Sequence, residues 1–235
     1  MKRFFSLLLF SLFISIYNLI TIPLFLIVFL ISPLLVNNKR FLDFFRRITI
    51  PNIPKGSTWI HGASVGEHTG TISLLDLVKK PFFTSNTKTG LERLRKNGIQ
   101  SWQMCWDIPF LIIPPIEEAK KIIITESELN PNLILFSKLY GKKLYLINGK
   151  MSRKSFISYS AIKPVMVEMF RLFDGIFVQN RVFKKRFEYF GVETKLLSNT
   201  KYYNLKLSTE NSKRIILFAS SHQSDEDIAF ALLKR

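Results

Sequence analysis

The sequence predicts an α/β protein, with a mostly parallel sheet and intervening helices, held at a membrane by an apolar N-terminal segment. Two observations predict this. Beyond residue 57, short apolar runs alternate with helical segments of about a dozen residues, which is typical of βαβ units. Near the start, residues 4–36 contain no charged residue and exceed the roughly 20 residues needed to cross a bilayer.

The apolar segment, residues 4–36, is crowded with Leu, Ile and Phe. It is too long for a secretory signal peptide and lacks a small-residue cleavage site, so we expect a retained anchor. Pro23 and Pro33 are expected to kink or end the helix. A single tilted span is favoured over a membrane hairpin, and a buried core helix is the least favoured alternative at this length.

Charges on either side of the anchor predict its orientation. Lys2 and Arg3 precede the anchor, and only Asp43 offsets the basic residues that follow it, which are Lys39, Arg40, Arg46 and Arg47. The positive-inside bias therefore places the body on the cytoplasmic side of the inner membrane. The single Cys105 excludes an intramolecular disulfide and fits a reducing compartment.

The formal net charge of +17 narrows the class of partner. Lys2 and Arg3 supply two of these charges, which leaves +15 on residues 37–235. A body this basic is attracted to anionic lipid by about 1 kcal/mol for each nearby Lys or Arg. Nucleic acid is the competing partner, but the sequence has no zinc-ligand set, RNP-type motif or basic coiled coil. We therefore expect a membrane partner and no nucleic acid.

The elements of the body follow in order. Strands are predicted where short apolar runs end at charged or turn residues: "STWIHGAS" (57–64), "PFFTSNT" (81–87), "KKIIITES" (120–127), "KKLYLINGK" (142–150), "GIFVQN" (175–180) and "KRIILFASS" (213–221). Helices are predicted where apolar residues recur at helical spacing: "TGTISLLDLVKK" (69–80), "TGLERLRKNG" (89–98), "PNLILFSKLYG" (131–141) and "RVFKKRFEYFG" (181–191). Neither G-x-G-x-x-G nor a Walker loop is present, so no classical dinucleotide or P-loop site is expected.

The domain organisation follows from these elements. Residues 1–36 are the anchor, 37–57 a proline-marked connection and 58–205 one α/β domain. One strand and one helix in residues 206–235 are too little to close a second core. This last unit either docks onto the first sheet or begins a second domain.

Polar side chains gather where four predicted strands end. They are Ser64 and Glu67; Thr125, Glu126, Ser127 and Glu128; Asn148, Lys150 and Ser152; and Ser220, Ser221 and His222. The carboxyl ends of neighbouring parallel strands converge on one crevice, so we expect Glu67 and Glu128 to meet there. The alternative for Glu67 is a purely structural role in the first turn of the next helix, where an acid suits the helix dipole.

Four motifs then carry a resemblance to a known family. "WIHGASVGE" (59–67), "TESELNPNL" (125–133), "NGKMSRKS" (148–155) and "SNTKYYN" (198–204) stand in the order and spacing found in the 3-deoxy-D-manno-octulosonic acid (Kdo) transferases of lipopolysaccharide synthesis. The resemblance runs from Trp59 to His222, and an N-terminal membrane anchor also matches. It implies a GT-B glycosyltransferase, in which a Rossmann-like N-terminal domain binds the lipid A precursor and a second domain binds CMP-Kdo.

The resemblance also implies roles for individual residues. Glu67 matches the general base, which takes a proton from a hydroxyl of the lipid A precursor as that oxygen attacks Kdo and CMP departs with inversion. The acceptor-binding positions are Ser64, Gly66, Glu126, Glu128 and Lys150, and the donor-binding positions are Asn199, Lys201, Ser220, Ser221 and His222. No metal or other cofactor is implied. The basic residues Lys88, Arg93, Arg95 and Lys96 are expected to meet lipid A phosphates or the membrane surface, unless they form a solvated helix face.

Departures from the family pattern leave two functional classes open. Asn130 stands where the family has Trp, Lys150 where it has Arg, and Ser198 where it has Gly. The later donor-site motifs do not occur before Arg235, so the second domain is expected to be truncated. The chain is then either a Kdo transferase completed by a separate chain that supplies the donor domain, or a catalytically inactive membrane-bound remnant that binds acceptor lipid.

Overall fold

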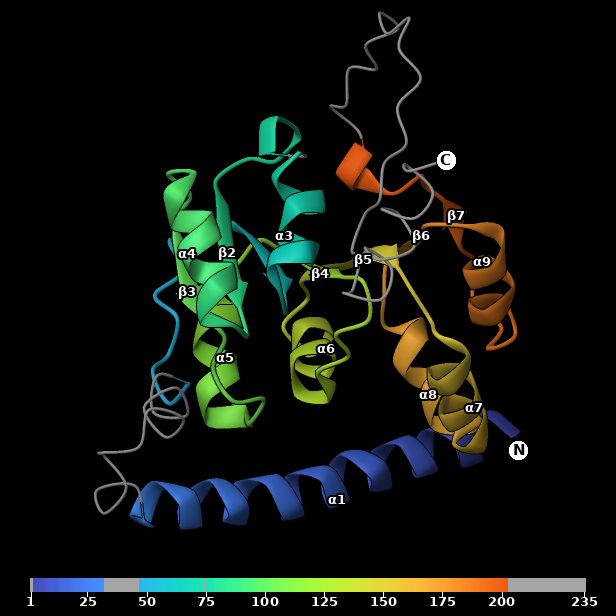
Figure 1. Cartoon of the computed structure of the whole chain (residues 1–235). Coiled ribbons are helices and arrows are strands. Elements are labelled where there is room, and N and C mark those ends of the chain that lie inside the picture. The colour runs from blue at the N-terminus through green and yellow to red at the C-terminus, as the bar shows by residue number, and fades with distance from the viewer. Residues whose placement is uncertain (1, 32–46, 74, 203–235) are drawn as a thin grey trace, which may run out of the picture. The chain divides into compact units, whose positions relative to one another are not determined.

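The structure is a computed structural model that describes residues 2–31, 47–73 and 75–202. Within these residues the chain forms a seven-stranded sheet in which every neighbouring pair is parallel (Figure 1). The strands are β1 Thr58–Gly62, β2 Pro81–Ser85, β3 Ser101–Gln103, β4 Lys121–Thr125, β5 Lys143–Gly149, β6 Gly175–Val178 and β7 Lys195–Leu196. The predicted α/β fold with a parallel sheet is confirmed.

Helices connect the strands and cover both faces of the sheet. They are α3 Val65–Ile72, α4 Lys88–Lys96, α5 Pro109–Glu118, α6 Pro131–Leu139, α7 Arg153–Ala161, α8 Lys163–Arg171 and α9 Arg181–Glu188, with short 3₁₀ turns η2 Leu75–Leu77 and η3 Thr200–Tyr202. Alternate strand residues point to opposite faces. Trp59 and Phe82 pack in the larger core with α5, α6 and α8, whereas Ile60 and Phe83 pack in a smaller core with Leu94 of α4.

The strand order places a switch point between β1 and β4. The order is β3-β2-β1-β4-β5-β6-β7, so the chain builds the sheet outward from β1 in one direction and then from β4 in the other. β1 and β4 pair directly, from Thr58 with Lys121 to His61 with Ile124. In open α/β sheets, ligands bind outside the carboxyl ends of the strands at this reversal. The fold therefore directs attention to the residues that follow Gly62 and Thr125.

One predicted boundary beside this point is wrong. The sequence predicted a strand over 57–64 and a helix over 69–80, but β1 ends at Gly62 and α3 runs from Val65 to Ile72. The reason is local capping. The Glu67 carboxylate accepts a hydrogen bond from the Ala63 backbone N–H at 2.6 Å, which fixes the start of the helix.

Several elements escaped the sequence pattern. β3 has only three residues, α5 contains Pro114 and Pro115, and the polar α7 buries none of its residues, so none gives a clear periodic signal. α8 was also missed. Pro23 does not end the first helix, α1 Lys2–Ile31, which continues past it. Pro33 and the predicted strand 213–221 lie outside the described residues.

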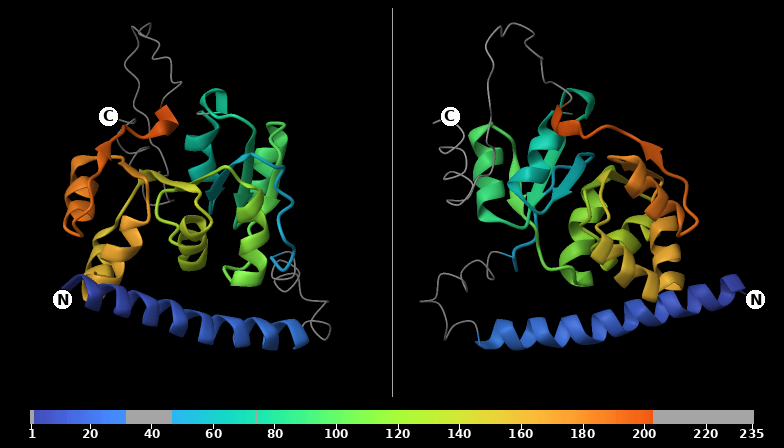
Figure 2. Two further views of the ribbon diagram at one scale, coloured as in Figure 1. Left: turned by 180° about the vertical axis from the view of Figure 1, so that it is seen from behind. Right: turned by 45° about the vertical axis from the view of Figure 1, so that its right-hand side comes forward.

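The N-terminal helix α1 is part of the folded body. Within the described residues, its segment Arg3–Ile31 is long and apolar enough to cross a membrane, judged by length and composition alone. Yet Phe10, Ile14 and Phe25 are buried in the larger core. In every view of Figures 1 and 2, α1 runs across the ends of α5, α6 and α8.

Candidate functional site

Glu67 lies at the switch point, in the first turn of α3, directly after β1. Its Oε2 atom accepts hydrogen bonds from the Ala63 N–H at 2.6 Å and from the Thr125 hydroxyl, at the end of β4, at 3.2 Å. Its Oε1 atom makes only one contact among the described residues, with the Ser64 hydroxyl at 3.5 Å. The carboxylate is thus oriented through one oxygen, and the other oxygen remains able to accept a proton.

The electrostatics around Glu67 favour a proton acceptor. Burial raises the pKa of Glu67 above its usual value of 4.5, and the neighbouring carboxylates Glu128 and Glu126 raise it further. Hydrogen bonds from Ala63 and Thr125 oppose this shift in the Glu67 pKa. A base works best when its pKa approaches the working pH, so the site moves Glu67 in the useful direction.

Glu126 follows β4 in a constrained turn. Its φ is +58°, a left-handed conformation that is uncommon for a non-glycine residue. Backbone hydrogen bonds hold the turn against the end of β5, from Glu126 N to Ile147 O at 2.9 Å and from Lys150 N to Glu126 O at 3.1 Å. The Glu126 side chain forms an ion pair with Lys201 Nζ at 3.3 Å. A cation therefore sits within the acid cluster, which we define as Glu67, Glu126 and Glu128.

Glu128 is the third carboxylate of the acid cluster. The Asn86 amide, just after β2, donates to Glu128 Oε2 at 3.2 Å. Burial raises the pKa of Glu128, and the positive charge of Arg47 opposes that rise. The Arg47 guanidinium lies 5.0 Å from the centre of the Trp106 ring. Glu67 and Glu128 thus meet at one edge of the sheet, as the sequence predicted.

The segment 198–202 is tied to the same edge. Asn148, at φ +53° near the end of β5, donates from its amide to the Thr200 hydroxyl at 2.6 Å and accepts from the Thr200 N–H at 3.2 Å. Asn199 Oδ1 accepts from the Lys201 N–H at 3.1 Å. α3 packs closely here, because a Cβ on Gly70 would lie 2.8 Å from atoms of both Asn148 and Thr200. This packing positions Lys201 beside Glu126.

The remaining predicted site residues fall into three groups. Ser64 and Gly66 lie beside Glu67, and a Cβ on Gly66 would come no closer than 3.6 Å to a neighbour. The Lys150 side chain is exposed, and only its backbone joins the acid cluster. Asn199 and Lys201, predicted to bind the donor, lie on the acid-cluster side. The remaining predicted donor residues, Ser220, Ser221 and His222, lie outside the described residues. Within the described part of the chain, no group of three His, Cys, Asp or Glu could hold a metal ion.

Sequence reasoning missed Arg47 and Asn86. Asn86 lies at the carboxyl end of the predicted strand 81–87 and directly after β2, and the rule that singled out Glu67 and Glu128 would have found it. Arg47 gave no such signal, because it was counted among the charges flanking the anchor. His61 and His68 are both fully buried beside Glu67, and burial lowers their pKa values to about 3 and about 4. Both are therefore neutral at pH 7, and His61 packs its Nδ1 atom 3.0 Å from the Thr84 hydroxyl.

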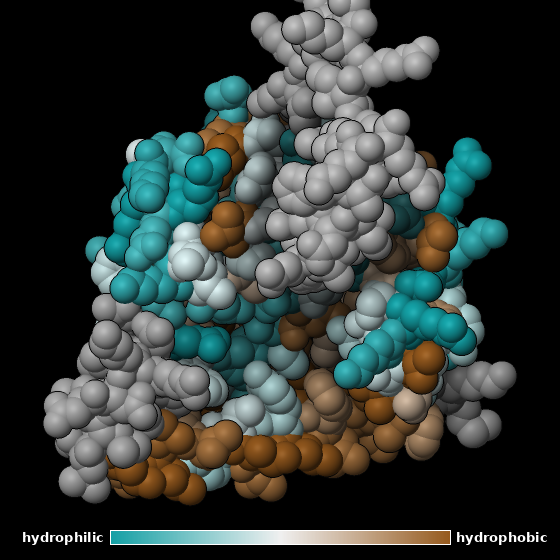
Figure 3. All heavy atoms as spheres, in the orientation of Figure 1, coloured by the Kyte–Doolittle hydropathy of each residue, from teal (hydrophilic) through white to brown (hydrophobic). Residues whose placement is uncertain are grey.

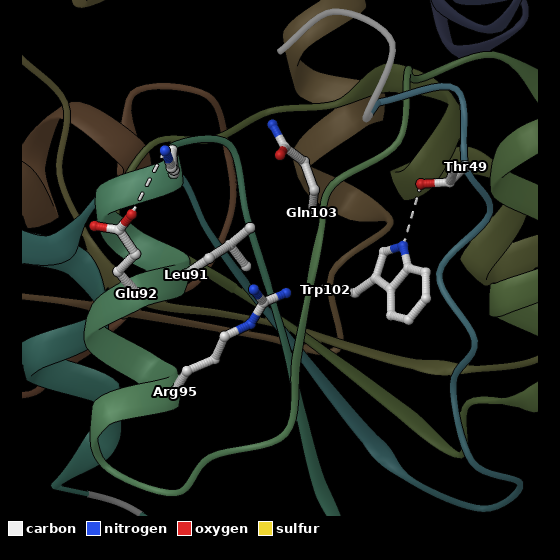
Figure 4. Close-up of a pocket in the computed structure, with 7 residues that line it drawn as sticks. Thr49, Leu91, Glu92, Arg95, Trp102 and Gln103 are labelled. Atoms are coloured by element: carbon white, nitrogen blue, oxygen red, sulfur yellow. Dashed lines mark hydrogen bonds and ion pairs between the residues drawn. The ribbon is translucent and has the colours of Figure 1, made fainter. Parts of the chain in front are cut away.

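A pocket of about 330 Å³ lies between α4 and β3 (Figure 4). It is lined by Thr49, Lys88, Leu91, Glu92, Arg95, Trp102 and Gln103. The Trp102 indole donates to the Thr49 hydroxyl at 3.3 Å and keeps part of its ring exposed. Gln103 Nε2 lies 3.5 Å from the Asn86 backbone oxygen, and Asn86 in turn binds Glu128. Of the four basic residues predicted to meet phosphate, Lys88 and Arg95 line this pocket, whereas Arg93 and Lys96 do not.

Strand order and site together define an α/β protein of the Rossmann-like class, with a carboxylate site at the switch point. Comparison with known proteins identifies the family within this class. The family model described as 3-deoxy-D-manno-octulosonic-acid transferase (kdotransferase) matches residues 39–204, so the chain belongs to that family. The resemblance seen in the four motifs is confirmed.

Curated relatives carry the same family name. The chain is 29% identical to a 3-deoxy-D-manno-octulosonic acid transferase of Rickettsia bellii over 208 residues, covering 75% of this chain and 47% of that protein. It is 25% identical to one of Chlamydia trachomatis (72% and 46% covered) and 26% identical to one of Haemophilus influenzae (74% and 47%). The chain therefore spans about half the length of these relatives. Among solved structures, the TrkA-N domain of an Escherichia coli inner membrane protein covers 78% of this chain and 98% of its own at 12% identity and a TM-score of 0.30, too low to inform fold or function.

Proposed function

We propose that this chain is the acceptor-binding half of a Kdo transferase-like glycosyltransferase of lipopolysaccharide synthesis. The observation that carries the proposal is the position of Glu67 and Glu128, which follow β1 and β4 and meet at the switch point. Family membership supplies the reaction class. The acceptor is a lipid A precursor, and the donor is CMP-Kdo.

Glu67 acts as general base in this proposal. A hydroxyl of the acceptor donates its hydrogen bond to Glu67 Oε1, the oxygen that Ala63 and Thr125 leave available. As the hydroxyl oxygen attacks the anomeric carbon of Kdo, its proton passes to Glu67, and the bond to CMP breaks with its electron pair on the phosphate. Such proton transfer contributes typically about 10²–10⁴-fold to the rate.

The other residues position the reactants. Glu128, which is held by Asn86, accepts a hydrogen bond from a second hydroxyl of the lipid A precursor. Ser64 and Gly66 line the site beside Glu67. Glu126 orients Lys201. We propose Asn199 and Lys201 as donor-binding residues and a separate chain as the source of the donor-binding domain. Membrane attachment through α1 leaves the body on the cytoplasmic face of the inner membrane.

A reconstitution experiment tests the function. The full chain is combined with a donor-binding half, taken from the unaligned part of the Rickettsia bellii relative, and with CMP-Kdo and a lipid A precursor. We expect Kdo transfer only when both halves are present, and we expect Glu67→Gln to abolish it while leaving precursor binding intact. The alternative, a remnant that binds acceptor without transfer, predicts precursor binding in every arm and no Kdo transfer. Failure of the chain to bind precursor would refute the acceptor assignment, and undiminished transfer by Glu67→Gln would refute the base.

A further inference from the structure

α1 contacts the body through a regular set of positions. Phe110, Asn132 and Pro164 are the second residues of α5, α6 and α8, and each of them touches α1. The Ser6 hydroxyl of α1 lies 3.0 Å from the Pro164 carbonyl oxygen, and the Phe25 ring packs edge-on against Phe110 at 5.5 Å. At a rise of 1.5 Å per residue, these contacts fix roughly 28 Å of the helix along the body.

The centre of the contact is a buried polar network. Asn18 and Asn132 exchange amide hydrogen bonds of 3.1 and 2.8 Å, and the Tyr17 hydroxyl donates to Asp107 at 3.1 Å. Asp107 in turn caps α6 by accepting from the backbone N–H groups of Asn132 at 2.9 Å and Leu133 at 2.8 Å. Asn132 is completely buried and Asp107 nearly so. The polar groups of α1 therefore complete a network that the body satisfies only in part, since the Asn132 amide also donates to the Asp107 carbonyl oxygen at 2.6 Å.

A crossing helix would break this network. Tyr17 and Asn18 stand in the middle of the apolar segment Arg3–Ile31, so a transmembrane α1 would place them near the bilayer centre. Polar side chains there lack water as a partner, and each unsatisfied group costs free energy. Asn132 and Asp107 would lose their hydrogen bonds with Asn18 and Tyr17 in the same step. When α1 is docked on the body, the polar side chains of α1 and those of the body both have hydrogen-bond partners.

The outer side of α1 is predominantly apolar, with Ser11 and Ser15 as its exposed polar residues beyond Arg3. Its exposed large side chains are Phe4, Phe5, Leu7, Leu8, Leu12, Ile16, Leu19, Ile20, Leu24, Leu26, Ile27, Phe29, Leu30 and Ile31. Figure 3 shows them as a continuous hydrophobic band along one border of the molecule. A patch of this extent marks a contact with a membrane or a partner. Cations beside it favour the membrane, because Arg3, Lys163 and Arg171 line a groove of about 570 Å³ between α1 and α8. Arg171 pairs with Glu168 in this groove at 2.8 Å, which leaves Arg3 and Lys163 to attract anionic headgroups.

We propose that α1 lies in the plane of the membrane, with its outer face in the acyl layer of one leaflet and its inner face docked on the body, so that α1 does not cross the bilayer. This differs from the crossing anchor that the sequence predicts. The geometry has a consequence for the acid cluster. α5 and α6 begin just after the carboxyl ends of β3 and β4, and Arg47 interacts electrostatically with both Asp107 in the α1 contact and Glu128. The edge that bears the acid cluster therefore faces the lipid surface, where a lipid-anchored substrate is presented.

Cysteine labelling of the full chain tests the proposal. Lys2→Cys reports the start of α1, and Lys185→Cys reports an exposed position on α9. Native Cys105 is a silent background, because it is buried and burial raises its thiol pKa to about 12. Sealed vesicles of both orientations are treated with a membrane-impermeant maleimide. We expect both cysteines to react from the same side; reaction from opposite sides would show that α1 crosses and would overturn the proposal.

A depth measurement gives a second reading. Leu12, Leu19 and Leu26 are exposed and spaced seven residues apart, so they share the outer face. A fluorophore on a cysteine at each position is quenched by lipids that carry a spin label at fixed depth. An in-plane helix gives three similar depths. A crossing helix places Leu19 deepest and the other two near opposite surfaces, which would contradict the proposal whether or not the labelling variants behave as intended.

Discussion

Glu67, in the first turn of α3, and Thr125, the last residue of β4, share a hydrogen bond of 3.2 Å across the switch point of the sheet. The Thr125 hydroxyl also lies 3.0 Å from the His61 carbonyl oxygen in β1. One side chain thus couples two neighbouring strand ends and fixes a carboxylate between them. The same glutamate accepts from Ala63 and so begins α3. The structural and the catalytic interpretations of Glu67 are compatible, because each uses a different oxygen.

The acid cluster predicts a shifted titration of Glu67. In the proposed function Glu67 acts when ionised, so transfer should be lost as pH falls through the Glu67 pKa, which burial and the carboxylates Glu128 and Glu126 raise above 4.5. Glu128→Gln removes one of these negative charges and should lower the Glu67 pKa. Carboxyl ¹³C titration of the chain measures it directly, and the acid limb of reconstituted transfer should move to lower pH in parallel. An unchanged Glu67 pKa in Glu128→Gln would contradict the coupling.

Two buried histidines predict a loss of stability in acid. The folded-state pKa values of His61 and His68 are lowered to about 3 and about 4 by burial, from 6.5. The unfolded chain then binds more protons, so stability is full above about 6.5 and is lost as pH falls towards the folded values. Between pH 7.5 and 5 each histidine should cost roughly 2 kcal/mol. Burial raises the pKa of Asp107 to about 6, so the contribution of Asp107 to folding stability increases as pH falls below about 6. This gain in stability offsets only part of the loss from the two histidines.

Denaturant unfolding at pH 7.5 and pH 5 measures this difference in detergent micelles. His68→Phe keeps an aromatic ring beside Phe83 and removes one titrating group. The pH-dependent loss should therefore shrink by about one histidine's share, whatever the variant's absolute stability. An unchanged loss would show that His68 protonates in the folded state.

Two glycines of α3 form a matched pair. A Cβ on Gly70 would lie 2.8 Å from the Asn148 amide and the Thr200 hydroxyl, whereas a Cβ on Gly66 would meet Lys201 only at 3.6 Å. Gly70→Ala should therefore displace segment 198–202 and destabilise the fold by about 1–3 kcal/mol. Gly66→Ala should leave the unfolding free energy nearly unchanged, and any effect it has should appear in acceptor binding. Equal destabilisation by both variants would argue against the close packing at Gly70.

The acid cluster was predictable from the sequence in part. Strand ends bearing Glu67, Glu126 and Glu128 were predictable, because alternation of elements implies a parallel sheet and a parallel sheet gathers its carboxyl ends. The start of α3 was not, because the capping bond from Ala63 to Glu67 has no periodic signature. Arg47 was interpreted only as a charge beside the anchor, since its contact with Trp106 and its interaction with Glu128 join segments far apart in the chain.

The docking of α1 was equally hidden from the sequence. Hydropathy reports how apolar a segment is, but it does not identify the groups of the body that form hydrogen bonds with the few polar residues of that segment. Asn18 pairs with Asn132, which is 114 positions away, and nothing in the local pattern of either residue indicates the other.

Asn18 predicts a coupling between α1 and the body. Asn18→Leu removes the donor to the buried Asn132 Oδ1 atom, while Asn132 Nδ2 keeps its bond to Asp107 O, and the loss should destabilise the body by about 1–3 kcal/mol. Thr21→Val is the control, because the Thr21 hydroxyl bonds only to Tyr17 O within α1, at 2.8 Å. Thermal unfolding in micelles, followed by hydrogen exchange at α6, compares the two. If both variants unfold like the parent chain, α1 is not docked through Asn18.

The pocket between α4 and β3 predicts where phosphate of the proposed acceptor binds. Lys88 and Arg95 line it beside the partly exposed Trp102 ring, and Gln103 and Asn86 connect it to Glu128. Arg93 and Lys96 lie on the same helix, α4, and are exposed, but they do not line the pocket. The double variants Lys88→Ala/Arg95→Ala and Arg93→Ala/Lys96→Ala therefore change net charge equally and alter different sides of the helix. The first variant also removes the exposed ion pair of Lys88 with Glu92 at 3.9 Å.

If phosphate of the acceptor enters the pocket, the first pair should weaken binding of a lipid A precursor in neutral mixed micelles by roughly 30-fold, since two nearby cations contribute about 1 kcal/mol each. The second pair should weaken binding by less than about threefold, because charges outside the pocket act on the phosphate only through screened, long-range attraction. Salt separates the two effects further: raising the ionic strength should abolish the small difference between the control pair and the parent chain but only reduce the larger one. Equal losses in both double variants, erased together by salt, would mean that α4 attracts the lipid surface as a whole and that the pocket holds no phosphate.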